Sequence, residues 1–223
     1  EQTDADIHNV AKAIGMDSRI GDKFLKAGPG FGGSCFKKDI SNLVYICNHY
    51  GLSEVANYWE QIININNWQR KRISEIIVET LFGTISGKKI AILGFSFKPD
   101  TNDTRESPAI EICKDLIEEG CNLSIYDPRV DKKQINTDLG FDNTKENINE
   151  SQLIIHESAN EAIIDADAIV IITNWQEFYN LDFHSYFQKM RRPSWIFDTR
   201  DVVDEAKLKN IGFKVWKLGK GEI

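Results

Sequence analysis

The apolar positions between residues 1 and 86 recur with the spacing of amphipathic helices. Segment 7–15 has apolar residues at i, i+3, i+4 and i+7, and segment 40–47 repeats this spacing just after Asp39, a helix-capping residue type. The segment from Ser53 onward contains neither glycine nor proline until Gly83, which predicts one helix of about 28 residues, against the usual ~11–12. Large apolar residues on more than one of its faces are typical of a helix that spans domains or packs on a partner subunit, although a helix enclosed by its own domain fits equally well.

From Gly87 onward the pattern changes to short apolar runs that alternate with helical segments. The runs read "KKIAILGF", "NLSIYDP", "DAIVIIT", "WIFDT" and "FKVWKL", and Ser107 followed by Pro108 opens one of the intervening helices. Strands that alternate with helices predict right-handed βαβ units and a parallel sheet. We interpret the polar, Asn-rich segment from Lys132 to Asn149 as a surface insertion.

Together these patterns predict an α/β protein with two domains. A central helical domain that contains the long helix occupies residues 1–86, and a Rossmann-like, doubly wound parallel sheet domain occupies residues 87–223. In such a sheet, ligands bind outside the carboxyl ends of the strands, so the loops that follow the strands are the first places to look for function.

The loops at these strand ends carry charged residues. The first strand is followed by "GFSFKPDTNDTRESP", which lacks the G-x-G-x-x-G fingerprint of dinucleotide binding but places Lys98 and Arg105 before a helix start, an arrangement that suits a phosphate. The alternative is that both are solvated loop charges. Asp127 ends the second strand, where it would contact a ribose or serve only in a turn. Arg200 directly follows a buried strand, which favours a ligand role.

Composition narrows the classes of function. The chain has 223 residues and a net charge of −7 at pH 7, which argues against a nonspecific nucleic-acid surface. No apolar run approaches the roughly 20 residues of a membrane helix, and the polar, acidic start does not resemble a signal peptide. The four cysteines form no Cys-x-x-Cys pair and the four histidines are scattered, so their spacing supports no metal site and favours reduced thiols in the cytoplasm. Because the chain opens close to a helix without an initiator Met, we expect a piece of a longer protein.

The stretch "KAGPGFGGSCFKKDISNL" combines glycines, a cysteine, lysines and a carboxylate. Glycines let the backbone approach a ligand closely, and their N–H groups can hold an oxyanion. Cys35 lies in this turn-rich loop near lysines and a helix start, which favours a nucleophilic thiolate over a small buried hydrophobe. The other cysteines fit the buried alternative, since Cys47 and Cys113 lie on apolar helix faces and Cys121 begins a strand.

The sequence offers Cys35 no histidine base by spacing, so a papain-like protease is disfavoured. A thiolate without such a base can add to an aldehyde, pass through hydride loss to a thioester, and wait for water. Asp39 lies one helical turn further on, where its carboxylate could handle that water.

These residues carry a resemblance to a known family. "GPGFGGSCFKKD" is very similar to the catalytic-cysteine motif of the UDP-glucose/GDP-mannose dehydrogenase family, and "IGMDSRIG", "GFSFKPDTNDTRESPA" and "FDTRDVVD" resemble further motifs of that family in the same order. The resemblance runs over nearly all of the chain. It implies the central and C-terminal domains of a longer enzyme, whose N-terminal NAD-binding Rossmann domain, with a lysine and a glutamate that assist the chemistry, lies outside this chain. On its own, this chain is then expected to be inactive.

The resemblance implies oxidation of the C6 alcohol of UDP-glucose to the carboxylate of UDP-glucuronate, with two NAD used per turnover. Cys35 would form the thiohemiacetal and then the thioester, and Asp39 would position or activate the hydrolytic water. The residues that would hold the UDP-sugar are Lys26, Ala27, Gly28, Pro29, Gly30, Phe31, Gly32, Phe97, Lys98 and Arg200, and Arg19 would reach the substrate of a neighbouring subunit. The residues that would border or contact NAD are Phe36, Lys37, Lys38 and Arg105. Lys37 departs from the family pattern, which often has Pro or Gln at this position.

Two classes of function stay open at this point. The first is the enzyme fragment, with GDP-mannose and UDP-N-acetylmannosamine as alternative substrates to UDP-glucose. The second is a non-catalytic module that binds a nucleotide sugar, which would need neither Cys35 nor Asp39. The resemblance further implies a homodimer or higher homo-oligomer formed through the central helices, with no nucleic-acid or membrane partner.

Overall fold

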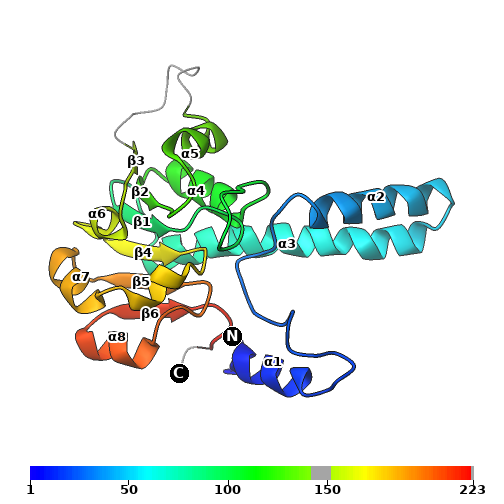
Figure 1. Ribbon diagram of the computed structural model, residues 1–223, viewed down its shortest axis with the longest axis horizontal. Coiled ribbons are helices and arrows are strands. Elements are labelled where there is room, and N and C mark those ends of the chain that lie inside the picture. The colour runs from blue at the N-terminus through cyan, green and yellow to red at the C-terminus, as the bar shows by residue number, and fades with distance from the viewer. Residues whose placement is uncertain (142–151, 222–223) are drawn as a thin grey trace.

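The computed structural model describes residues 1–141 and 152–221. Three helices come first, followed by an α/β sheet domain from which a pair of long helices projects (Figure 1). The first three helices are α1 (Ile7–Gly15), α2 (Phe36–His49) and α3 (Ser53–Thr80). The remaining helices are α4 (Pro108–Glu118), α5 (Lys132–Leu139), α6 (Ala159–Ile163), the 3-10 helix η2 (Gln176–Asn180), α7 (Phe183–Lys189) and α8 (Glu205–Ile211).

The sheet confirms the predicted Rossmann-like α/β fold. Its strands are β1 (Lys89–Leu93), β2 (Asn122–Tyr126), β3 (Leu153–Ile155), β4 (Ala168–Ile171), β5 (Trp195–Asp198) and β6 (Lys214–Lys217). They pair in the order β3-β2-β1-β4-β5-β6, and every pairing is parallel. The order reverses between β1 and β4, which is the doubly wound arrangement.

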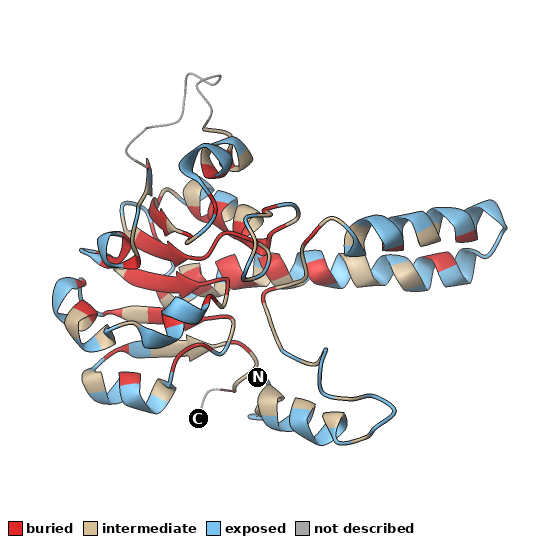
Figure 2. Ribbon diagram, viewed as in Figure 1, coloured by how far each residue is buried: buried red, intermediate tan, exposed pale blue. Residues whose placement is uncertain are grey.

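Alternate residues of β1 pack into two separate cores, because successive side chains of a strand point to opposite faces. Ile90 and Ile92 belong to the core under α3, α4 and α5, whereas Ala91 and Leu93 belong to the core under α6, α7 and α8. Figure 2 shows this burial concentrated in the sheet and in the part of α3 that lies against it. A sheet buried on both faces explains why its strands read as continuous apolar runs.

The long helix is confirmed with the predicted length, 28 residues from Ser53 to Thr80. Its carboxyl half is part of the sheet domain, since Ile73 and Ile77 share one core with Ile90. Its amino half pairs with α2, and much of this helical hairpin is exposed (Figure 2). The domain boundary between residues 86 and 87 stays a prediction.

Helix α1 lies against the carboxyl-terminal end of the described chain (Figure 1). Asp6 caps it by accepting from the His8 amide at 2.8 Å, and the Ile7 amide donates to the Gly219 carbonyl at 2.8 Å. The His8 ring nitrogen Nδ1 lies 3.6 Å from the carboxylate of Asp201, in the loop after β5. The start of the chain is therefore held by the edge of the sheet.

The structure differs from the sequence predictions in the start of one helix and in two elements that were not predicted. Helix α2 begins at Phe36, directly after Cys35, and not after Asp39, so Asp39 lies in its first turn. Strand β3 was not predicted, because only three residues of it pair with β2. The segment interpreted as an insertion forms α5 at residues 132–139, with Ile135 buried and Asp131 as its cap. Residues 142–149 of this segment lie outside the described residues.

No helix within residues 1–141 and 152–221 has the length and apolar character needed to cross a bilayer.

Candidate active site

Cys35 lies where the glycine loop, residues 26–33, meets α2. Its side chain is exposed, and its sulfur lies 3.8 Å from the Ser34 hydroxyl. The Cys35 carbonyl accepts the first helical hydrogen bond, from the Asp39 amide at 2.8 Å, while the thiol caps none of the described amides of α2. Cys35 therefore stands at the amino-terminal end of α2, where a helix concentrates positive potential.

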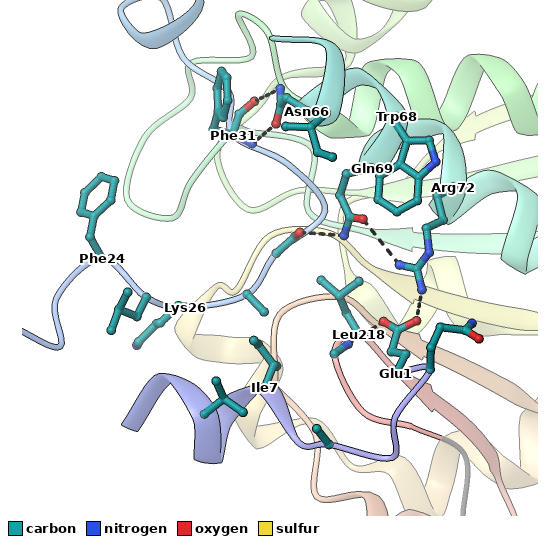
Figure 3. Close-up of a pocket in the computed structure, with 18 of the residues that line it drawn as sticks. Glu1, Ile7, Phe24, Lys26, Phe31, Asn66, Trp68, Gln69, Arg72 and Leu218 are labelled. Carbon is teal, nitrogen blue, oxygen red and sulfur yellow. Dashed lines mark hydrogen bonds and ion pairs between the residues drawn. The ribbon is translucent and has the colours of Figure 1, made fainter. Parts of the chain in front are cut away.

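Three side chains of α3 hold one side of the glycine loop. Asn66 Oδ1 accepts from the Phe31 amide at 2.8 Å and Asn66 Nδ2 donates to the Phe31 carbonyl at 3.2 Å (Figure 3). Gln69 Nε2 donates to the Gly28 carbonyl at 3.3 Å, and Arg70 Nη2 donates to the Phe31 carbonyl at 2.6 Å. The backbone of Phe31 is thus satisfied by α3, which removes its amide from the set that could hold an oxyanion.

The other side of the glycine loop packs on the β1 loop, which runs from Gly94 to Ser107. The Gly33 amide donates to the Arg105 carbonyl at 2.8 Å. A Cβ added at Gly32 would lie 2.4 Å from the Glu106 carbonyl oxygen. The absence of a side chain is therefore what lets the loop that carries Cys35 rest on the loop after β1.

Arg200 reaches the glycine loop from the end of β5. Its Nε donates to the Ile172 carbonyl at 2.7 Å, and a Cβ added at Gly28 would lie 2.7 Å from its Nη1. Burial lowers the pKa of the Arg200 guanidinium to about 10, so it stays charged at neutral pH. A desolvated cation at the ligand edge of a parallel sheet is suited to pair with a phosphate.

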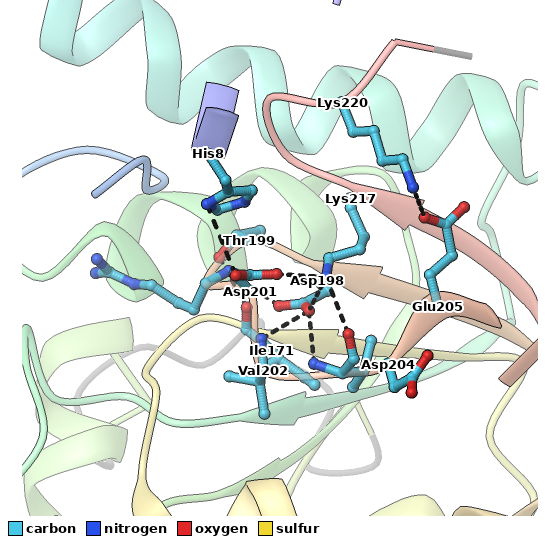
Figure 4. A network of polar contacts seen from close by, with 12 residues as sticks. His8, Ile171, Asp198, Thr199, Asp201, Val202, Asp204, Glu205, Lys217 and Lys220 are labelled. Atoms are coloured by element: carbon cyan, nitrogen blue, oxygen red, sulfur yellow. Dashed lines mark hydrogen bonds and ion pairs between the residues drawn. The ribbon is translucent and has the colours of Figure 1, made fainter. Parts of the chain in front are cut away.

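Asp198 fixes the loop that presents Arg200. Its carboxylate accepts from the amides of Arg200 at 3.0 Å, Val202 at 2.8 Å and Val203 at 2.9 Å, in the network of Figure 4. Burial raises the pKa of Asp198, while these amides and Lys217 act in the opposite direction. The backbone at Arg200 is therefore held by hydrogen bonds to Asp198, the last residue of β5.

Asp127 serves the turn and not a ribose. Its carboxylate accepts from the amides of Phe95 (2.6 Å), Ser96 (3.0 Å), Arg129 (2.9 Å) and Val130 (3.0 Å) and from the indole of Trp175 (3.1 Å). A Cβ at Gly94 would lie 2.4 Å from Thr173 Cβ, which shows how tightly the loops after β1 and β4 meet. The crevice at the reversal of strand order, where a doubly wound sheet usually admits a dinucleotide, is thus filled by this chain's own side chains.

Arg105 lies on the Cys35 side of the β1 loop. It forms a two-pronged pair with Asp103, with Nε–Oδ1 at 2.9 Å and Nη2–Oδ2 at 2.7 Å. The hydrogen bonds to Asp103 raise the pKa of Arg105 most, and the charge of Cys35 contributes in the same direction. Arg105 is exposed, so its cation is available to a ligand next to the thiol.

The first turn of α2 carries the remaining charged residues predicted for the site. Lys37 Nζ pairs with the Glu106 carboxylate at 2.9 and 3.1 Å, so its side chain joins α2 to the β1 loop. Lys38 and Asp39 are exposed, and Lys38 Nζ lies 3.8 Å from Asp39 Oδ1. The side chain that departs from the family pattern therefore has a contact within the chain itself.

Aromatic rings cluster around Phe36, the residue that follows Cys35. The ring of Phe36 lies 5.2 Å from that of Phe31 and 6.2 Å from that of Phe24. On the β1 loop, Lys98 Nζ lies 5.4 Å from the centre of the Phe97 ring. These rings offer flat apolar surfaces next to cations, which is a suitable lining for a nucleotide sugar.

The other predicted residues divide into two groups. Within the glycine loop, Lys26 is exposed, Ala27 packs against the core, Pro29 is buried, and Gly30 has a φ of +122° beside Asn66. Arg19 is different: its side chain is 87% exposed and pairs with Asp17 at 2.6 Å. No contact among residues 1–141 and 152–221 brings it to the glycine loop.

A cavity of about 940 Å³ opens beside the glycine loop (Figure 3). It shares Lys26, Ala27, Gly28 and Phe31 with the predicted substrate residues, and Trp68 and Leu218 form part of its apolar wall. Cys35, Lys98 and Arg200 are not in its lining. The cavity therefore lies next to the predicted site, but the predicted nucleophile and the phosphate-binding cations are outside it.

Comparison with known proteins shows which family the chain belongs to. A family model described as the UDP binding domain of the UDP-glucose/GDP-mannose dehydrogenase family matches residues 91–205, and one described as its central domain matches residues 1–68. The chain belongs to the UDP-glucose/GDP-mannose dehydrogenase family. The resemblance seen in the sequence is confirmed.

Individual members of the UDP-glucose/GDP-mannose dehydrogenase family match along nearly the whole chain. The UDP-glucose 6-dehydrogenase of Drosophila melanogaster is 50% identical over 222 residues, which is 99% of this chain and 47% of that protein. UDP-glucose 6-dehydrogenase 1 of Arabidopsis thaliana is 48% identical over 232 residues, with 99% and 48% covered. A solved UDP-glucose dehydrogenase of Pyrobaculum islandicum is 26% identical with a TM-score of 0.78, over 97% of this chain and 44% of that one. This chain thus spans about half the length of the curated relatives it matches.

Asn66, Arg70 and Glu106 are the site residues that the sequence analysis missed in this family member. A signal was present for two of them: Asn66 and Arg70 lie on the same helical stripe as Ile73 and Ile77, so they are polar residues on the buried face of α3. A buried polar side chain needs partners, and here the partners are two loops far away in the sequence.

Proposed function

We propose that this chain is the substrate-binding and nucleophile-bearing part of an NAD-dependent UDP-glucose 6-dehydrogenase, which oxidises UDP-glucose to UDP-glucuronate. The observation that carries the proposal is the position of Cys35: an exposed thiol at the start of α2, on a loop that packs against the loops after β1 and β5. Identity of about half to UDP-glucose 6-dehydrogenases of a fly and a plant supports UDP-glucose over GDP-mannose or UDP-N-acetylmannosamine.

The proposed site for uridine diphosphate lies between the glycine loop and the carboxyl ends of the strands. Arg200 supplies a half-buried cation there, and Lys98 supplies an exposed one on the β1 loop. Phe31, on the glycine loop, and Phe97, on the β1 loop, offer aromatic rings to the uridine or the sugar. The sugar then extends toward Cys35, because the reacting carbon must lie within bonding distance of the sulfur.

In the proposed chemistry Cys35 makes and breaks the covalent bonds to the sugar. Once the C6 alcohol has lost a hydride and a proton to give the aldehyde, the thiolate adds to the carbonyl carbon as a thiohemiacetal. A second hydride loss gives the thioester, and water attacks its carbonyl carbon and releases the carboxylate and the thiol. Asp39, one turn along α2, is the group proposed to accept a proton from that water.

NAD, when bound, supplies the hydride acceptor for both oxidations. Arg105 and Phe36 border Cys35 and fit one wall of such a site, with Lys38 exposed beside them, while Lys37 is paired with Glu106. The crevice of this chain's own sheet is filled, so we propose that the rest of the NAD site belongs to a further domain of the full-length protein. This chain alone is then expected to give no NADH from UDP-glucose.

We propose that two copies of the chain pair through the central helices. The outer face of α3 carries the exposed side chains of Tyr58, Ile65 and Trp68, and α2 adds Tyr45. Exposed apolar side chains at helical spacing are typical of an interface, and a second copy presents the same face to itself. An Ile65→Asp variant is expected to sediment as a smaller species than the wild-type protein, because the charge disrupts the interface. Its fold should be unchanged.

The state of the cysteines supports a cytoplasmic location. All four are free thiols, and Cys47, Cys113 and Cys121 are buried. Free thiols fit a reducing compartment.

The test uses the full-length protein that contains this chain. We expect it to form two NADH for each UDP-glucose consumed, and to turn over GDP-mannose and UDP-N-acetylmannosamine far more slowly. Cys35→Ser should block completion of the reaction, because serine is a poorer nucleophile and its ester a poorer acyl donor than the thioester. If the wild-type protein binds UDP-glucose without reducing NAD, it is a nucleotide-sugar-binding module, and the proposal is wrong.

A further inference from the structure

Arg70 connects α3 to the two loops that flank Cys35. Its side chain is 2% exposed. Its Nη2 donates to the Phe31 carbonyl at 2.6 Å and to the Glu106 carbonyl at 2.8 Å, and its Nη1 lies 3.0 Å from Glu111 Oε1 on α4. One guanidinium thus bonds the glycine loop, the β1 loop and the first turn of α4.

Phe31 and Glu106 each contact one of the two residues that directly follow Cys35 in α2. The Phe31 ring packs on Phe36, the residue that follows Cys35, at 5.2 Å. The Glu106 carboxylate pairs with Lys37 at 2.9 Å, one residue further along α2. A shift of either carbonyl held by Arg70 would therefore move the start of α2 and the thiol with it.

Glu106 adopts a conformation that needs support from its surroundings. Its φ is +55°, in the left-handed region that residues with a side chain seldom enter. Arg70 supplies support at two points, by its bond to the Glu106 carbonyl and by its Nη1, 3.8 Å from the Glu106 carboxylate. Within the part of the chain that the structure describes, Arg70 Nε has no acceptor, so the loop contacts at the other end of the guanidinium set its orientation.

We propose that Arg70 is a positioning residue for Cys35: it holds the Phe31 and Glu106 carbonyls together, so that the thiol and Arg105 face the same substrate. The inference rests on the proposed function. A lysine cannot replace it, because an ammonium on a flexible stem lacks the planar fork that meets two carbonyls and a carboxylate at once.

The contacts of the glycine loop predict whether loss of Arg70 affects substrate binding or the rate of the reaction. Gly28, at the end of the loop nearest Arg200, is held by Gln69 independently of Arg70. Loss of the Arg70 fork should therefore leave the nucleotide end of the site in place and misplace Cys35. The expected signature is a lower kcat with little change in KM, because only the reacting end loses its geometry.

The test compares Arg70→Lys with Arg72→Lys in the full-length protein that contains this chain. Arg72 lies two residues along the same helix and pairs with Glu1, so it is a matched control for the substitution. For Arg70→Lys we expect kcat for UDP-glucose to fall at least about tenfold, with KM within about threefold. We also expect the rate of Cys35 alkylation by iodoacetamide to change by about threefold or more, while Arg72→Lys matches wild type in every readout.

A second variant covers the case in which Arg70→Lys does not fold. Glu111→Gln weakens the hold on the guanidinium without touching either loop, and it should lower kcat by about two- to fivefold with KM unchanged. If Arg70→Lys folds and keeps the wild-type kcat and alkylation rate, or if Glu111→Gln is indistinguishable from wild type when Arg70→Lys is unfolded, Arg70 is only structural and the inference is overturned. A wild-type protein that does not oxidise UDP-glucose contradicts the proposed function instead, and the alkylation comparison still decides the role of Arg70.

Discussion

The backbone of Gly28 lies directly against the guanidinium of Arg200, so close that a Cβ on Gly28 would come within 2.7 Å of Nη1. Gly28 belongs to the glycine loop, whereas Arg200 follows strand β5 of the sheet. The Nε of Arg200 donates to the Ile172 carbonyl. We therefore expect an anion bound by Arg200 to lie next to the glycine loop.

This contact predicts that Gly28→Ala weakens nucleotide binding more than it weakens the fold. The added methyl group displaces the guanidinium from its place, and part of a charge-assisted contact of about 1.5–3 kcal/mol is lost, so UDP affinity should fall roughly tenfold. Titration calorimetry with the full-length protein measures the effect. Gly51→Ala is the control, because nothing lies within 4 Å of a Cβ there.

Gly32→Ala is expected to disturb the thiol as well as stability. Its Cβ would meet the Glu106 carbonyl at 2.4 Å, and neither backbone can yield without moving the loop that carries Cys35. The cost should be about 1–3 kcal/mol of unfolding free energy, measured by urea denaturation of the purified chain. Gly51→Ala is again the comparison: it should lose about 1 kcal/mol to its left-handed φ of +72° and leave the alkylation rate of Cys35 unchanged.

Cys35 should be the most reactive thiol of the folded chain. It is exposed, whereas Cys47, Cys113 and Cys121 are buried, and burial raises the pKa of Cys121 to about 12. With limiting iodoacetamide at neutral pH, peptide mass spectrometry should find Cys35 modified at least about ten times faster than the other three. Earlier modification of any other cysteine under native conditions would refute the assignment.

His156 should make the stability of the chain depend on pH below neutrality. Burial lowers its pKa from the ordinary 6.5, and its Nε2 is hydrogen-bonded to the Ser124 hydroxyl at 2.7 Å. The unfolded chain then binds a proton that the folded chain does not, so stability falls as the pH drops below 6.5 and levels off below the folded pKa. His156→Gln should make the thermal midpoint fall less between about pH 7 and about pH 5, whereas His184→Gln, at an exposed position, should not.

The periodicity of the sequence was sufficient for the sheet and the long helix. Strands buried on both faces leave unmistakable apolar runs, and α3 has no residue that would break it. Strand β3 and helix α5 were missed because each is short: β3 pairs over three residues, and α5 has only Ile135 and Leu139 on its buried side. Short elements owe their form to the neighbours they pack on, which local sequence does not reveal.

The roles of the site residues stay predictions. Cys35, Lys98 and Arg200 stood out by their residue type and by their place next to the end of a helix or strand, whereas Phe97 was named only through the family resemblance. The contacts of Arg70 with Phe31 and Glu106 could not be read from the sequence, because their partners are separated by 39 and 36 positions along the chain. Only the fold brings a helix stripe, a glycine loop and a strand-end loop to one guanidinium.

The central claim is that uridine diphosphate binds between the glycine loop and the carboxyl ends of β1 and β5. The most direct measurement is calorimetric titration of UDP into the full-length protein and its Arg200→Ala, Lys98→Ala and Lys132→Ala/Lys133→Ala variants. Losing a cation that contacts phosphate should weaken binding by roughly ten- to a hundredfold, so both single variants should fall in that range. The double variant removes solvated charges on α5 and should bind as wild type does. Wild-type affinity in both Arg200→Ala and Lys98→Ala would contradict the account and place the nucleotide elsewhere.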